Sequence, residues 1–72
     1  MTHQVLDRDD PAVAGAVHRL SAEFAGRVGA PVVVKVVRGC RRELDGAPVL
    51  ALPELVERLA RERLRQSGSA RR

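Results

Sequence analysis

The feature that most constrains the fold is the run "PVVVKVVRGCRREL", residues 31–44, in which five of the first seven residues are valines. Valine favours β-strands, but a strand would have no polar face here and no second strand candidate in the chain to pair with. Read as a helix beginning at Pro31, the run gathers its apolar side chains on one face, namely Val33, Val36, Val37, Cys40 and Leu44. The opposite face is basic, with Lys35, Arg38, Arg41 and Arg42. The period therefore predicts a helix, because burial can override the propensity of β-branched residues.

The first helix is predicted to have Asp10 as its N-cap and Pro11 as its first residue, because aspartate can cap a helix and proline suits the first helical position. Its apolar residues recur at spacings of three and four and form one stripe, composed of Val13, Val17, Leu20 and Phe24. Gly26 and Gly29 are expected to end it.

A third helix is predicted after the break at Asp45, Gly46 and Pro48, with a start between Val49 and Pro53. Its apolar arc is broad and comprises Leu52, Leu55, Val56, Leu59 and Ala60, of which Leu52 and Val56 are assigned to the core. On its other side, glutamates and arginines are spaced for i,i+4 pairing, Glu54 with Arg58 and Glu57 with Arg61. The sequence thus predicts an all-α three-helix bundle over residues 10–65, with a flexible leader at 1–9 and a disordered basic tail at 66–72.

The net charge of +4 invites a nucleic-acid interpretation, but its location argues against one. Residues 58–72 hold six arginines and one glutamate, which leaves seven basic and eight acidic residues in 1–57. The segment "FAGRVGAPVVVKVV" matches part of a helix-turn-helix pattern, and a small basic DNA-binding protein of that type is the alternative interpretation. Its reading positions would be Val32, Val33 and Val34, which have no polar group to hydrogen-bond to base edges or phosphates. At most weak, non-specific nucleic-acid binding is expected.

No residue pattern points to catalysis or to a cofactor. Cys40 lies on the predicted core face, where a cysteine acts as a small hydrophobic residue, and His3 and His18 have no partner that would make them ligands or bases. The chain has no secretory signal and no apolar stretch long enough to span a bilayer. We therefore expect a cytoplasmic protein that is not an enzyme and holds no metal.

A second copy of the chain is the expected partner. A 72-residue chain with one cysteine and two histidines cannot add a disulfide or a zinc site to its small core. It also has surplus apolar surface, because Val34 lies outside the core arc of its helix and the arc of the third helix is wider than two neighbours need. Val34, Leu55 and Leu59 are the predicted interface residues.

Three segments, "VHRLSAEFAG", "VVVKVVRGCRREL" and "LPELVERLARERL", resemble a small actinobacterial family of three-helix bundle dimerisation domain proteins over roughly residues 12–65. The pattern is also similar to the N-terminal helical module of some low-molecular-weight phosphatase-like and arsenate-reductase-like proteins, whose catalytic domain has no counterpart here. The resemblance implies a non-catalytic homodimerisation or adaptor module, with an unidentified protein as a further possible partner.

Overall fold

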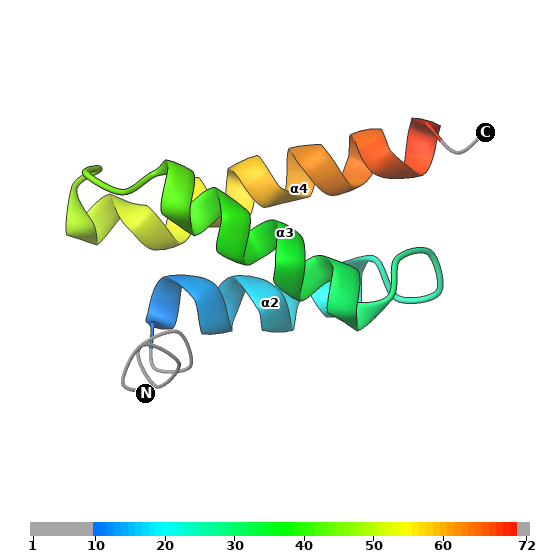
Figure 1. The fold of residues 1–72 in the computed structure, drawn as a ribbon. Helices are drawn as coiled ribbons and strands as arrows, with labels where there is room; N and C mark the ends of the chain where they lie inside the picture. Colours follow the sequence, from blue (N-terminus) through cyan, green and yellow to red (C-terminus); the bar gives the residue numbers. More distant parts are fainter. Residues whose placement is uncertain (1–9, 71–72) are drawn as a thin grey trace.

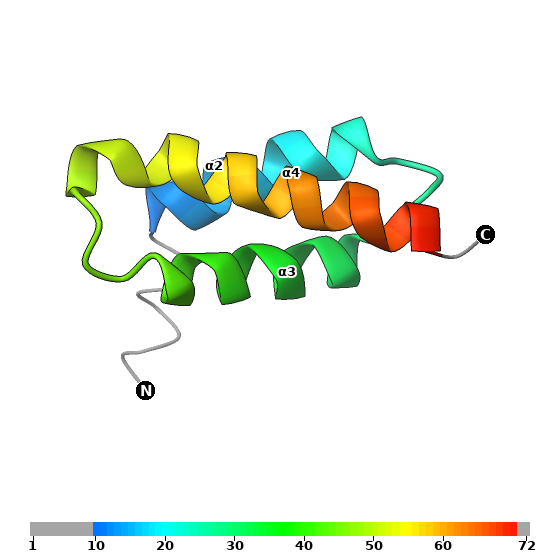
Figure 2. The ribbon, with the colours of Figure 1, turned by 90° about the horizontal axis from the view of Figure 1, so that it is seen from above.

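The computed structural model describes residues 10–70, and the side chains among them through Ser67. It contains the helices α2 (Pro11–Glu23), α3 (Ala30–Glu43) and α4 (Leu52–Ala70), with a short 3-10 helix η1 (Val49–Ala51) before α4. The chain runs along the bundle, back and along again, so that α3 is antiparallel to both α2 and α4 (Figure 1). Seen from above, α4 lies over the space between the other two helices (Figure 2). The predicted all-α three-helix bundle is confirmed.

The start of α2 follows from two adjacent residues. Asp10 has extended backbone geometry, and its Oδ1 accepts a 2.9 Å hydrogen bond from the backbone N–H of Ala12. Pro11 occupies the first helical position, where its missing N–H costs nothing. After α2, Gly26 turns the chain with a φ of +87°, a conformation that suits glycine.

The valine run is helical, as its period predicts. The helix α3 begins at Ala30, one residue before the expected Pro31, and Gly29 caps it without a side-chain hydrogen bond. Val33, Val37 and Cys40 of this helix are completely buried. Their burial offsets the conformational cost of β-branched residues, which is about 0.7 kcal/mol or less for each relative to alanine.

The third helix begins at Leu52, inside the predicted window, after Gly46 has reversed the chain with a φ of +102°. Its end differs from the prediction: α4 continues to Ala70, whereas the sequence placed the end of the bundle at 65 and a disordered tail at 66–72. No proline interrupts the backbone hydrogen bonds beyond Gln66, so the helix propagates through weak helix formers. The predicted leader at 1–9 and the tail residues 71–72 lie outside the described residues.

The core contains most of the predicted side chains. Buried among them are Val13, Leu20, Phe24, Val33, Val37, Cys40, Leu52 and Val56, while Val17, Val36 and Leu44 are half-buried against them. Four more buried residues were not assigned to the core from the sequence, namely Ala12, Ala16, Ala60 and Leu64. Alanine allows α2 and α4 to approach closely, and Leu64 extends the α4 stripe by one turn.

Candidate functional site

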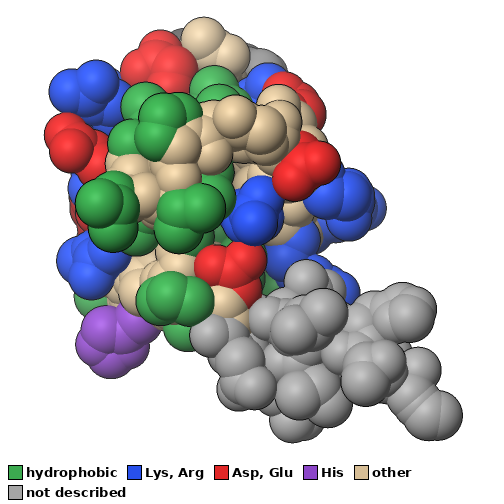
Figure 3. Space-filling model, turned by 90° about the vertical axis from the view of Figure 1, so that its left-hand side faces the viewer, with side chains coloured by type: hydrophobic (Ala, Val, Ile, Leu, Met, Phe, Trp, Pro, Cys, Tyr) green, Lys and Arg blue, Asp and Glu red, His purple; other side chains and the backbone are tan. Residues whose placement is uncertain are grey.

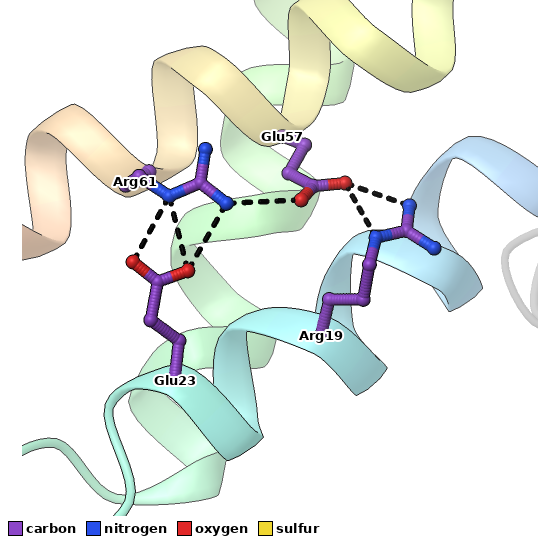
Figure 4. A network of polar contacts seen from close by, with 4 residues as sticks. All are labelled: Arg19, Glu23, Glu57 and Arg61. Carbon is purple, nitrogen blue, oxygen red and sulfur yellow. Dashed lines mark hydrogen bonds and ion pairs between the residues drawn. The ribbon is translucent and has the colours of Figure 1, made fainter.

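The seam between α2 and α4 is closed by a network of four charged side chains (Figure 4). Arg19 of α2 donates a 2.7 Å hydrogen bond from Nε to Glu57 Oε1, and Arg61 donates a 3.0 Å bond to the other oxygen of Glu57. Arg61 also donates from Nε to both oxygens of Glu23, at 3.1 and 3.0 Å. The hydrogen bond from Arg19 is the main reason that the pKa of Glu57 lies below its usual value. These four charges pair with one another across the seam.

Each of the other two seams also carries an ion pair between helices. Arg63 of α4 forms a bidentate ion pair with Glu43 of α3, and both hydrogen bonds are 2.8 Å long. Arg41 of α3 donates a 2.9 Å bond from Nε to Asp10 Oδ2 at the start of α2. The bundle is thus tied electrostatically along all three seams.

Cys40 lies beneath the Arg63 guanidinium, with Nη1 at 3.7 Å from Sγ. Burial raises the pKa of its thiol, and this effect outweighs the opposing influence of Arg63. The side chain is completely buried, so this thiol is a core residue rather than an accessible nucleophile.

An apolar depression lies on α4 beside the end of α3. Leu44, Leu55 and Leu59 line it, and Arg58 and Glu62 form its charged rim. Leu44 and Leu59 also pack against the core, whereas Leu55 is half-buried without belonging to the core cluster. Leu55 therefore presents apolar surface that the fold itself does not use.

The structure brings together two of the three predicted interface residues. Leu55 and Leu59 share the apolar depression, but Val34 lines a separate depression on α3. The other residues around Val34 are Pro31 and three cations, Lys35, Arg38 and Arg42. Val34 is half-buried and shares no lining residue with the two leucines, so it belongs to a different surface.

Two exposed hydrophobic residues were missed from the sequence. Val49 and Leu50 of η1, which directly follow Pro48, are 75% and 96% exposed. Figure 3 looks onto this end of the bundle and shows several hydrophobic side chains among charged ones. The sequence signal for them is the apolar run between Pro48 and Pro53, which also fits the beginning of a helix.

Features that could bind a metal, serve as a titratable catalytic group or span a membrane are sparse among the described residues. No group of three or more His, Cys, Asp or Glu side chains is placed to hold a metal ion in the part of the chain that the structure describes. His18 is exposed on α2, and several of the glutamates lie in ion pairs with arginines. None of the described helices combines the length and hydrophobicity that a bilayer crossing requires.

The helix-turn-helix interpretation gains no support from the geometry. Residues 24–29 connect α2 and α3, a longer link than the roughly three or four residues typical of that motif. The two helices run back along one another in both views (Figures 1 and 2). The first turn of α3 exposes Val32, which cannot hydrogen-bond to a base edge.

No protein family model, curated protein or solved structure matches this chain. The resemblance to the three-helix bundle dimerisation family therefore stays a prediction from the quoted segments, and function has to be argued from the surfaces of the bundle.

Proposed function

We propose that this chain is a non-catalytic homodimerisation or adaptor module that self-associates through the apolar depression on α4. The observation that carries the proposal is Leu55, a half-buried leucine in the depression that does not pack into the core. A leucine costs free energy when it faces water, and a second copy can cover it.

The size of the domain supports the same proposal. A single core in a chain of 72 residues supplies only a few kcal/mol of stability, and a partner subunit adds to it through mass action. The depression at the α2/α4 seam is lined mainly by charged side chains, Arg19, Glu57 and Arg61 among them, whereas three leucines line the depression beside the end of α3. The geometry separates Val34 from this apolar depression, so the proposed interface is centred on Leu55 and Leu59.

The matched variants Leu55→Asp and Val34→Asp test the proposal. We expect wild type to be a dimer by sedimentation equilibrium at high micromolar concentration, with a melting temperature that falls on dilution. Leu55→Asp would bury a charge in the interface and should yield monomers with little change in helical content, because Leu55 lies outside the core cluster. Val34 lines the separate depression, so Val34→Asp should leave the dimer intact.

A wild-type chain that stays monomeric at high micromolar concentration would contradict the proposal. Binding to duplex DNA is the second measurement, and we expect it to be weak and abolished by added salt. A tight, sequence-selective complex at physiological salt would instead favour the helix-turn-helix interpretation.

A further inference from the structure

A row of four charged side chains runs along α4 beside the apolar depression. We call it the charge row, and its members are Glu54, Arg58, Glu62 and Arg65. Its side chains are largely exposed, from 57% for Glu62 to 78% for Glu54. Their charges alternate along the helix in the order negative, positive, negative, positive.

Within the chain, the charge row is only loosely paired. Arg58 lies 3.8 Å from Glu54, and Arg65 lies 3.8 Å from Glu62. The cross-helix bonds of the α2/α4 network are much shorter, at 2.7 to 3.1 Å. The charge row can therefore exchange its partners at little cost, because exposed pairs of this kind contribute less than about 1 kcal/mol each.

An alternating row with an even number of charges is complementary to itself when it is reversed. Read in the opposite direction, the charge row becomes positive, negative, positive, negative, so an antiparallel copy presents an opposite charge at every position. A parallel copy in register would instead place each side chain opposite the same side chain of the partner, so that like charges face each other. A two-fold axis requires this reciprocity, since residue i must contact residue j of the partner and j must contact i.

We propose that a second copy docks antiparallel along α4 across a two-fold axis level with residue 60, an inference that rests on the proposed homodimerisation. At a rise of about 1.5 Å per residue, Arg58 then lies level with Glu62 of the partner subunit. Glu54 lies within one residue of the level of Arg65 of the partner subunit. The charge row forms one edge of the interface, and the apolar depression, which shares Arg58 and Glu62 with it, forms the centre.

The position of Leu59 fits the same axis. It lies one residue from the level of the axis, so the two copies of Leu59 meet near the centre of the interface. Leu44 from the end of α3 lines the same depression. An apolar centre with a charged edge is the usual composition of a protein interface.

Charge reversal within the row tests this geometry. The double variant Arg58→Glu with Arg65→Glu carries an entirely acidic row, and Glu54→Arg with Glu62→Arg carries an entirely basic one. We expect each to self-associate about tenfold or more weakly than wild type, because like charges then face each other across the axis. An equimolar mixture should form a heterodimer, and the variant with all four reversals should self-associate like wild type.

Lys35→Glu with Arg42→Glu is the matched control, because it changes the net charge as much as the acidic row does. Both residues lie on the exposed side of α3, and this variant should dimerise normally. Circular dichroism of each variant establishes that the bundle is folded before association is measured.

The outcomes separate this inference from the proposed function. If wild type dimerises and the single-sign rows dimerise equally well, the antiparallel arrangement is wrong while homodimerisation stands. If wild type is monomeric, homodimerisation itself fails and the inference fails with it. Loss of association in the control as well would trace the effect to net charge and overturn the role of the row.

Discussion

Arg41 of α3 donates a hydrogen bond from Nε to Oδ2 of Asp10, the same carboxylate whose Oδ1 caps α2. One side chain thus fixes the first turn of α2 and joins it to α3, which lies far along the sequence. Local and tertiary structure are coupled at this position.

Replacing Asp10 with alanine should remove both contacts. We expect the free energy of unfolding to fall by about 1–2 kcal/mol, since a helix cap contributes about 1 kcal/mol and a partly exposed ion pair somewhat less. Asp10→Ser retains a capping oxygen and should lose only the ion pair. Urea denaturation at one fixed protein concentration measures both, and equal losses for the two variants would contradict the double role.

Glu57 makes stability depend on pH. Its pKa is lowered in the folded state, chiefly by the hydrogen bond from Arg19, so the folded protein binds a proton at this site less readily than the unfolded chain does. Its contribution is therefore complete above the unfolded pKa, near 4.5, and is lost as the pH falls through the lower folded value.

The variant Glu57→Gln should lower stability at pH 7 by about 1–2 kcal/mol and should reduce the loss of stability between pH 5 and pH 3. Asp45→Asn, at an exposed position outside the charge row, is the control and should change neither. Thermal melts across this pH range provide the measurement. If Glu57→Gln loses as much stability between pH 5 and pH 3 as wild type does, Glu57 is not the group that causes this loss.

The Cys40 thiol should react only when the bundle opens. Burial raises its pKa and removes it from solvent, so an aromatic disulfide reagent at pH 8 should modify it at the rate of unfolding. Addition of urea should accelerate the reaction in parallel with the loss of helical signal. Rapid modification of the fully folded protein would contradict the burial.

Two glycines should respond oppositely to substitution by alanine. Gly39 lies within α3, and a Cβ there meets no atom within 4 Å, so Gly39→Ala should stabilise the protein by about 0.5–1 kcal/mol. Gly46 has a φ of +102°, and Gly46→Ala should destabilise by about 1 kcal/mol or more. Both shifts can be measured by thermal melting at equal protein concentration.

The valine run shows why periodicity outweighed propensity in predicting this fold. Val33, Val37 and Cys40 recur with the helical period, and the partner that a strand would need is absent from the sequence. The limits of α4 were less predictable, because Ser67 and Gly68 are weak helix formers without a strict stop signal. Leu64 continues the helical spacing one turn beyond Ala60 and is buried, whereas the predicted core ends at Val56.

The site was only partly predictable. The i,i+4 pairing of Glu57 with Arg61 follows from spacing alone, but the bond from Arg19 depends on how α2 lies beside α4. The separation of Val34 from Leu55 likewise depends on which flank of each helix faces a neighbour. Hydrophobic pattern fixes which face of a helix is inside, but it does not determine the neighbour on either side.

The ion pairs along the seams also bear on the winding of the bundle. Three helices joined in this order can be arranged in two ways, with the bundle turning to the left or to the right. In the opposite winding α2 and α3 exchange places beside α4, so that Arg63 leaves Glu43 and Glu57 leaves Arg19. The charges along the seams therefore favour the observed hand of the bundle over its opposite.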